Sequence, residues 1–433
     1  MKQVIEASYP LSFRHNDANL LGEHLKHHKS VVLVGMKRVG ISNFLRFFLN
    51  HESIVPTYIK NGLDQIFVQV DLNDLIERNI NAFWTLLLTR VVDIIQGSKL
   101  PESVKRQCRK LFVQSIQLKD QFFTVDSLRK ALIALIDAGY YPTLFIIRFD
   151  RLKDVATHDF LSNLMGLRDA VKGKLSYVFT SYRPLEDLAP DVFKKQFLSI
   201  FTSNMYLTPA TAKDAKIILE TLEHEHHISF PDYIKSDLIT VCGGYVQYLQ
   251  LALIRLAGEK TLPINHKSLV ELLENDEQIA LQSEELFESL ANVEKEVLVR
   301  IRQGVTISED DRKHAEYLWN TGMVHGNGDR TEFFSTLFTA FVKIQQSAAP
   351  IHEKEFTKKE HRLFIFLQEH ENTLCERETI IDAVWPEHKE FGVSDWAIDR
   401  LVARLRSKLK AQGSLFEIQT VVTRGYKLIR KSG

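Results

Sequence analysis

The alternation of apolar and polar positions changes its period along the chain, and each change marks a predicted element. Four short runs of β-branched and other apolar residues predict buried parallel strands, at residues 30–35, 65–72, 143–150 and 175–184. Three stretches with helical spacing lie between them, at residues 36–50, 81–96 and 124–139. For the last helix, Thr124 or Asp126 is the expected N-cap and Gly139 the expected C-cap. Strands that alternate with helices predict a doubly wound α/β domain.

After about residue 208 the strand pattern stops and helical periodicity takes over. Residues 211–226 and 232–258 predict a helical lid, with a break at Gly243 and Gly244. Residues 284–343 predict a small helical unit that ends in a short β-wing. The polar stretch 345–355 contains one proline and predicts a linker.

The C-terminal stretch predicts three helices followed by two strands. Thr357 and Glu360 have the spacing of a capping box, which places the start of the first helix. In the third helix, residues 394–413, one stripe is apolar and consists of Ala397, Ile398, Leu401, Leu405 and Leu409. The strands are expected at residues 416–421 and 426–430, with a tight turn between them.

Charge is balanced over the whole chain but concentrated at its C-terminal end. The 55 basic and 55 acidic side chains cancel. Residues 394–433 nevertheless hold nine Lys or Arg and three Asp or Glu, a net charge of +6. Such a basic end is the electrostatic footprint expected of a DNA-binding protein, because phosphate contacts dominate affinity for DNA.

Cysteine content and the lack of long apolar runs narrow the remaining classes of protein. Three widely spaced cysteines, Cys108, Cys242 and Cys375, indicate reduced thiols rather than a metal site. No secretion signal is recognisable, and no run approaches the ~18 apolar residues needed to span a bilayer. We therefore expect a cytoplasmic, nucleoid-associated protein with no membrane partner. No metal site is predicted, since the histidines among glutamates near residues 224–227 favour a solvated helix face.

A glycine-containing turn follows the first predicted strand. Gly35, Gly40 and Ser42 have the spacing of the phosphate-binding loop G-x-x-x-x-G-K-[ST], between a strand and a helix as that motif requires. Ile41 takes the place of the lysine, so the usual cation for the β- and γ-phosphates is missing. Backbone N–H groups can still attract an anion, and Lys37 or Arg38 are the basic residues closest in sequence.

The second half of a nucleotide site is altered as well. Asp150 ends the third predicted strand and is the candidate Mg²⁺ ligand. Arg151 follows it, where many such ATPases carry the glutamate that activates water. No catalytic residue is therefore assigned. Three alternatives stay open: a structural remnant without nucleotide, binding of ATP or ADP with Mg²⁺ without efficient turnover, and hydrolysis supported by another basic residue.

The C-terminal stretch resembles the OmpR/PhoB-type winged helix of bacterial response regulators. The matching segments are residues 357–367, 377–386, 394–409 and 420–428. The resemblance implies that the third helix is a recognition helix and that a wing contacts DNA. The residues expected to face double-stranded DNA are Trp396, Arg400, Arg404, Arg406, Lys408, Arg424 and Lys427. Trp396 and Val422 depart from the family pattern, which leaves the target sequence open.

The preceding part, from about residue 16 to 343, resembles the STAND and archaeal-type AAA+ ATPases. The matching segments are residues 31–45, 144–152, 177–184 and 243–250. In the last one, Tyr245 and Val246 replace the histidine and proline of the family motif G-G-H-P. The resemblance implies a P-loop core, a helical lid and a first winged helix.

The predicted fold class is thus a multidomain α/β plus α+β protein. A P-loop NTPase-like, doubly wound core with a helical lid is followed by two winged-helix domains. The expected boundaries are 1–207 for the core, 208–283 for the lid, 284–345 for the first winged helix, 346–355 for the linker and 356–433 for the DNA-binding domain.

The preferred hypothesis is a DNA-binding transcriptional regulator. Its STAND-like module would sense a ligand, or assemble with a partner protein or a second copy, and would have lost ATP hydrolysis. The alternatives are a nucleotide-dependent ATPase switch that acts on DNA and a scaffold that docks proteins through its winged helices. A further alternative is that the basic face of the third helix is only a solvated surface, which would support none of these functions.

Overall fold

The computed structural model describes residues 4–59, 64–193, 202–259, 261–326, 331–347, 356–386, 393, 395–421 and 424–430. The chain divides into two compact units. The first consists of Met1–Thr221, Gly244–Val246 and Tyr317–Val324, and the second of Leu222–Gly243, Gln247–Glu316 and His325–Gly433.

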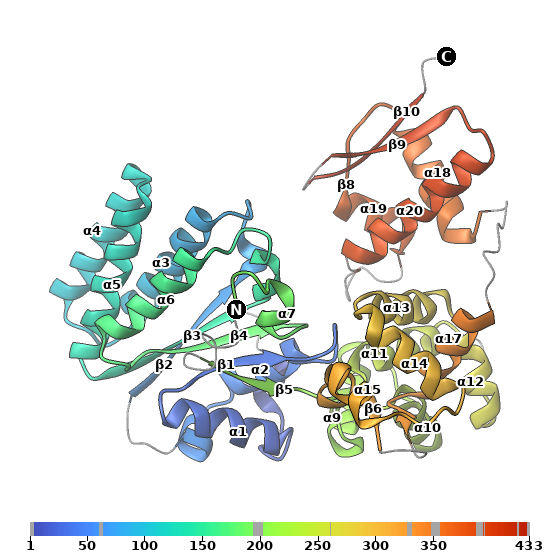
Figure 1. Cartoon of the computed structure of the whole chain (residues 1–433), viewed down its shortest axis with the longest axis horizontal. Coiled ribbons are helices and arrows are strands. Elements are labelled where there is room, and N and C mark those ends of the chain that lie inside the picture. Colours follow the sequence, from blue (N-terminus) through green and yellow to red (C-terminus); the bar gives the residue numbers. More distant parts are fainter. Residues whose placement is uncertain are drawn as a thin grey trace. The chain divides into compact units, whose positions relative to one another are not determined.

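A parallel sheet, five-stranded within the described residues, forms the centre of the first unit (Figure 1). Its order is β2-β3-β4-β1-β5, and its strands are β1 Ser30–Val34, β2 Asp64–Asp71, β3 Tyr140–Ile147, β4 Ser176–Ser181 and β5 Thr202–Tyr206. Every residue of β1 and β4 is buried, as expected for central strands covered on both faces. The predicted α/β core is confirmed. The sequence analysis missed β5.

Helices cover both faces of this sheet. They are α1 His15–Lys26, α2 Ile41–Asn50, α3 Ile80–Gly97, α4 Glu102–Leu118, α5 Gln121–Asp137, α6 His158–Ala170 and the short α7 Leu185–Leu188. Helices α3 to α6 lie together on one side and α1 lies on the other (Figure 1). The loop between β1 and α2 follows the carboxyl end of β1, which is an inner strand of the sheet.

One predicted helix start was wrong. Helix α5 begins at Gln121, because the carboxylate of Asp120 accepts the backbone N–H of Phe123 at 2.6 Å. Thr124 and Asp126 therefore lie inside the helix rather than at its N-cap. At the other end the C-cap is Ala138, and Gly139 follows it with a φ of +90°.

The predicted helical region follows the sheet. Its helices are α9 Ala212–Glu225, α10 Asp232–Cys242, α11 Val246–Ala257, α12 His266–Glu274 and α13 Glu277–Glu288. The predicted break at Gly243 and Gly244 is confirmed. Both glycines have positive φ, and a Cβ on Gly243 would lie 1.7 Å from the carbonyl oxygen of Phe334.

A stretch of helices with a two-stranded wing comes next along the chain, in the order expected from the sequence. It contains α14 Asn292–Arg302, α15 Glu309–His314, α16 Glu316–Asn320, β6 Val324–His325, β7 Glu332–Phe333 and α17 Thr336–Ser347. Helix α13 runs through residues 283 and 284, where we expected this unit to begin. Most of the predicted linker, residues 348–355, lies outside the described residues.

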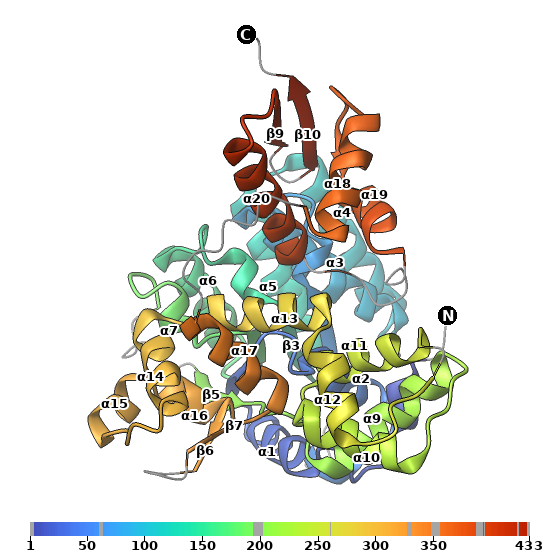
Figure 2. The ribbon, with the colours of Figure 1, turned by 90° about the vertical axis from the view of Figure 1, so that its right-hand side faces the viewer.

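The C-terminal domain has the order predicted for a winged helix (Figure 2). Its elements are α18 Lys358–Glu369, β8 Cys375–Glu376, α19 Arg377–Val384, α20 Asp395–Ala411, β9 Phe416–Val421 and β10 Gly425–Arg430. The strands form an antiparallel sheet with the order β8-β10-β9. The capping box of Thr357 and Glu360 is present at the start of α18. The sequence analysis missed β8.

This domain has a hydrophobic core of its own. Fourteen buried residues between Leu363 and Leu428 form one cluster, with Trp385 fully buried at 0% exposure. Burial of each large apolar side chain contributes ~1.5–3 kcal/mol. A core made only of residues from this domain indicates that it can fold alone. None of the described helices is long and apolar enough to cross a membrane.

Candidate nucleic-acid interface and candidate nucleotide site

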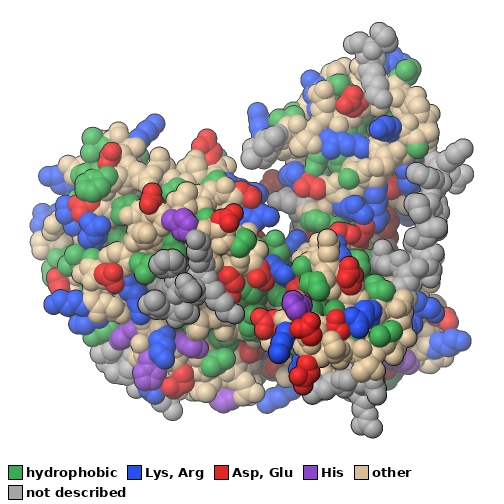
Figure 3. All heavy atoms as spheres, in the orientation of Figure 1, with side chains coloured by type: hydrophobic (Ala, Val, Ile, Leu, Met, Phe, Trp, Pro, Cys, Tyr) green, Lys and Arg blue, Asp and Glu red, His purple; other side chains and the backbone are tan. Residues whose placement is uncertain are grey.

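Helix α20 presents two chemically different faces. The predicted apolar stripe is buried throughout and consists of Ala397, Ile398, Leu401, Leu405 and Leu409. The other face is polar and half-buried, and carries Arg400, Arg404, Arg406 and Lys408. Lys and Arg side chains are visible over this domain in Figure 3. The stripe fixes the rotation of the helix, so the position of the basic face follows from the core.

Arg400 and Arg404 share one carboxylate. The Nε of Arg400 donates to Oε1 of Glu284 at 2.8 Å, and Nη2 of Arg404 donates to Oε2 of the same residue. Glu284 lies on α13, and its side chain is only 9% exposed. Two of the arginines expected to face DNA are thus brought together, and one buried carboxylate is bonded to both.

The other two basic residues of α20 are held within their own domain. Arg406 donates to the backbone oxygen of Ile418 at 2.8 Å and to the hydroxyl of Thr420 at 2.7 Å, both on β9. Lys408 lies 2.7 Å from Oε2 of Glu360, the acid of the capping box. In this arrangement Arg406 braces the wing, and Lys408 balances a carboxylate that is 1% exposed.

The remaining residues predicted to face DNA lie on or near the wing. Arg424 is exposed, with Nη2 at 4.0 Å from Oε1 of Glu376. Lys427 on β10 and Trp396 near the start of α20 are half-buried. Val422, where the sequence departs from the family pattern, lies outside the described residues.

A polar cluster that joins α19, α20 and β10 was not predicted. Arg377 lies 2.6 Å from Oδ1 of Asp399, and the hydroxyl of Tyr426 donates to the same carboxylate. Burial and the neighbouring Asp399 raise the pKa of Tyr426 to about 12. The cluster connects α20 to α19 and to β10. No local spacing in the sequence indicates it, because its members are far apart along the chain.

Residues 35–42 connect β1 to α2 as the spacing of the motif predicts. Gly40 is the N-cap of α2 with a φ of +112°, and a Cβ there would lie 2.7 Å from Cγ2 of Val246. The hydroxyl of Tyr245 donates to the carbonyl oxygen of Lys37 at 2.5 Å. Tyr245 and Val246, which replace the histidine and proline of the G-G-H-P motif, therefore lie directly against the loop.

The side chains of this loop do not reproduce the usual phosphate cradle. Ile41 is half-buried, and its Cδ1 would lie 3.3 Å from a Cβ on Gly35. Lys37 has its Nζ 5.0 Å from the ring centre of Tyr182. Arg38 adopts a left-handed backbone conformation, and Ser42 is exposed on the first turn of α2. An uncharged side chain occupies the position where the motif has its lysine.

Asp150 is not at the end of a strand, and that prediction was wrong. Strand β3 ends at Ile147, and Asp150 lies in the 3-10 turn Phe149–Leu152. Arg148 causes the early end, because it takes a left-handed conformation and donates its backbone N–H to the hydroxyl of Thr180 at 2.8 Å. The position directly after the strand therefore carries a cation instead of a carboxylate.

The charges around Asp150 follow from this geometry. Burial raises the pKa of Asp150, and the positive charges of Lys37, Arg151 and Arg148 oppose that rise. Arg151 donates to Oδ1 of Asn73 at 2.7 Å. The residue that stands where ATPases carry their catalytic glutamate is thus engaged in a structural contact.

Arg14 was missed by the sequence analysis. Its side chain is 3% exposed, and Nη1 donates to Asp17 and to the carbonyl of Thr208, each at 3.1 Å. Among the described residues, its Nε and Nη2 are buried and have no hydrogen-bond partner. Nη2 would lie 3.9 Å from a Cβ on Gly40. A buried cation with unused donors therefore lies beside the loop that lacks a lysine.

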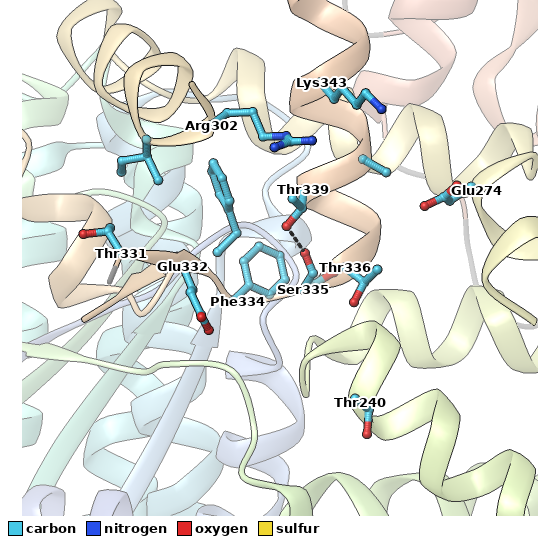
Figure 4. A pocket seen from close by; sticks show the side chains of 13 residues that line it. Thr240, Glu274, Arg302, Thr331, Glu332, Phe334, Ser335, Thr336, Thr339 and Lys343 are labelled. Atoms are coloured by element: carbon cyan, nitrogen blue, oxygen red, sulfur yellow. Dashed lines mark hydrogen bonds between the residues drawn. The ribbon is translucent and has the colours of Figure 1, made fainter. Parts of the chain in front are cut away.

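The second unit contains a hollow of about 580 Å³ (Figure 4). Its lining combines cations, acids, hydroxyls and aromatic rings, and includes Arg302, Lys343, Glu274, Glu332, Thr240 and Phe334. Within the part of the chain that the structure describes, the Nε of Arg302 is buried and has no hydrogen-bond partner. The hollow is therefore lined by both apolar and charged groups.

Comparison with protein families identifies one region. Residues 352–428 match the family described as "Transcriptional regulatory protein, C terminal". No curated protein matches the chain.

Solved structures similar to the chain are P-loop ATPases. The ORC2 protein of Aeropyrum pernix, solved with ADPNP and ADP, is 14% identical, with a TM-score of 0.47, over 80% of this chain and 99% of that one. The Walker-type ATPase PABY2304 of Pyrococcus abyssi is 14% identical, with a TM-score of 0.47, over 76% and 95%. The Holliday junction branch migration motor RuvB of Thermotoga maritima is 12% identical, with a TM-score of 0.34, over 74% and 91%. The C-terminal domain is similar to the OmpR/PhoB-type winged helix of transcriptional regulators.

Proposed function

We propose that this protein is a DNA-binding transcriptional regulator whose recognition helix is α20. The observation that carries the proposal is the two-faced helix itself. Its apolar stripe is locked into a winged-helix core, and its basic face remains half-exposed in a domain that matches a transcriptional regulatory family. The working compartment that follows is the cytoplasm, at the nucleoid.

Guanidinium groups suit this task for a physical reason. Arginine offers paired donors that match phosphate oxygens and the O6 and N7 atoms of guanine. Arg400 and Arg404 are one helical turn apart, so they reach the same stretch of a groove. Arg424 on the wing is exposed and can extend from Glu376 to a neighbouring phosphate. Arg406 and Lys408 are bonded within their own domain and contribute mainly by fixing its structure.

The first unit serves as a sensing or assembly module that has lost hydrolysis. Ile41 brings no charge to the loop, and Asp150 lies beyond the strand end where a Mg²⁺ ligand is needed. The residues present fit an anion held by backbone N–H groups better than a hydrolytic centre. The hollow of the second unit is where we expect a small effector to bind.

A selection from random-sequence duplexes tests the proposal. The full chain and residues 356–433 alone are each used, with and without ATP. We expect both proteins to recover the same sequence, whether or not ATP is present. Recovery of no sequence by either protein would contradict DNA binding. Recovery that requires ATP would instead support the ATPase switch.

Arg14 favours a second candidate, nucleotide binding without turnover. Its unused donors beside Gly40 can take over part of the role of the missing lysine. Calorimetry with ADP and ATP tests this idea. Arg14→Lys, which keeps the charge but removes the unused donors, should weaken binding about tenfold. Arg46→Lys, which alters an arginine paired with Glu6, is the matched control and should leave binding unchanged. No heat with the wild-type protein would exclude the candidate.

A further inference from the structure

We propose that α13 is an internal docking surface for the recognition helix, and that Glu284 and DNA phosphate compete for Arg400 and Arg404. The inference rests on the proposed DNA-binding function and adds a regulatory device to it. Both helices belong to the second unit and pack against each other (Figure 2).

Both oxygens of Glu284 are used in the contact. Oε1 accepts from Nε and Nη2 of Arg400, and Oε2 accepts from Nη2 of Arg404. Charge-assisted bonds of this kind are roughly twice as strong as neutral ones. A single carboxylate thus binds two guanidinium groups that project from the same face of α20.

The burial of Glu284 makes the pairing more than a surface ion pair. Its side chain is 9% exposed, whereas those of Arg400 and Arg404 are 41% and 36% exposed. A carboxylate this buried is unfavourable without a counter-charge. The two arginines supply that charge. Docking therefore also stabilises the buried carboxylate of Glu284 on α13.

A second contact joins the same two parts. The hydroxyl of Thr357, the N-cap of α18, lies 3.3 Å from Oε1 of Glu277 in the first turn of α13. Helix α13 therefore touches the C-terminal domain at two elements, α18 and α20. Two separated contacts define an orientation, which one flexible ion pair would not.

Docking and DNA binding exclude each other. Donors that are bonded to Glu284 are not available to a phosphate or a base edge. The apparent affinity for DNA is then reduced by the fraction of molecules in which α20 is free. An effector that separates α20 from α13 would raise DNA binding without touching DNA.

Glu284→Gln removes the charge of the docking residue and keeps its shape. The probe is the duplex recovered with residues 356–433. We expect the full-length variant to bind it about tenfold tighter than the wild type, within the usual range of coupling between sites. Glu288→Gln is the control, because Glu288 on the same helix pairs with Lys295 at 3.0 Å. Equal affinity of Glu284→Gln and wild type, with binding by residues 356–433 intact, would overturn the docking proposal. Failure of residues 356–433 to bind any duplex would instead contradict the proposed function.

A disulfide provides a second test that does not alter Glu284. Glu277→Cys with Thr357→Cys places two thiols at the second contact, while Cys108, Cys242 and Cys375 are buried. Oxidation should lock α18 to α13 and abolish duplex binding, and reduction should restore it. A disulfide that forms and leaves duplex binding unchanged would contradict the docking surface.

Discussion

Helix α20 and the loop after β1 are the two places where the sequence predicts an anionic partner, but only in the loop is a cation of the motif replaced by an uncharged residue. In α20 the apolar stripe is buried and Arg400 and Arg404 remain on the accessible face. In residues 35–42 the backbone of the motif remains, with Gly40 in its left-handed conformation, but Ile41 carries no charge. The comparison teaches that the backbone geometry of a loop can be kept when a charged residue of its motif is replaced, because packing and backbone geometry depend on other residues than ligand charge does.

The largest expected effect is on stability, and it distinguishes the hydrophobic core of the C-terminal domain from that of the first unit. Leu405→Ala should destabilise the C-terminal domain by ~2–5 kcal/mol, because it leaves a cavity under α20. Duplex binding by residues 356–433 should weaken as the folded fraction of this domain decreases. Urea denaturation followed by circular dichroism measures the loss. Leu33→Ala in β1 is the comparison, and it should destabilise the first unit without weakening duplex binding.

The next effect concerns the cluster of Arg377, Asp399 and Tyr426. The pKa of Tyr426 is raised from 10.0 to about 12, so folding favours the neutral hydroxyl. The stability is fully present below pH 10 and is lost as the pH rises through 12, up to ~2 kcal/mol. Denaturation of residues 356–433 across this window measures it. Tyr426→Phe should show a smaller loss, and identical pH dependence of the two proteins would exclude the cluster as the cause.

A smaller effect tests the basic face directly. Arg404→Ala should weaken binding of residues 356–433 to the selected duplex by ~1–2 kcal/mol and reduce the salt dependence by about one ion. Fluorescence anisotropy at several salt concentrations gives both values. Lys410→Ala, an exposed residue in the last turn of α20, is the control and should change binding less. A larger loss with Lys410→Ala would place the DNA elsewhere on the domain.

The smallest effect concerns the loop. Ile41→Lys restores the lysine of the motif and should improve ATP binding severalfold at most, since Asp150 still lies beyond the end of β3. ATP hydrolysis should stay at the background rate. Calorimetry and a phosphate-release assay check the two outcomes. Turnover after this single change would show that the site has kept its catalytic arrangement and would weaken the contrast drawn above.

Periodicity was sufficient to predict most of the fold. The buried stripe of α20, the capping box at Thr357 and the four apolar strands depend on local sequence, and the structure confirms them. Strand β5 has the polar sequence TSNMY, so its pattern did not indicate a buried strand. Asp150 was placed wrongly because β3 ends before Arg148. The backbone N–H of Arg148 donates to the hydroxyl of Thr180, and no local pattern indicates this distant contact.

The site could be predicted only in part, because its partners are distant in sequence. The arginines of α20 follow from helical spacing, but their partner Glu284 lies 116 residues from Arg400. Arg14 gave no signal, since its position beside Gly40 depends on how distant parts of the chain fold together. Charge and spacing therefore indicated candidate residues, and only the structure showed what they touch.

The central claim is that the basic face of α20 binds double-stranded DNA. The most direct measurement is the salt dependence of duplex binding by residues 356–433, followed by fluorescence anisotropy. We predict that log K falls linearly with log salt, with a slope set by the phosphates contacted. An affinity that is absent at low salt, or that does not change with salt, would contradict the claim.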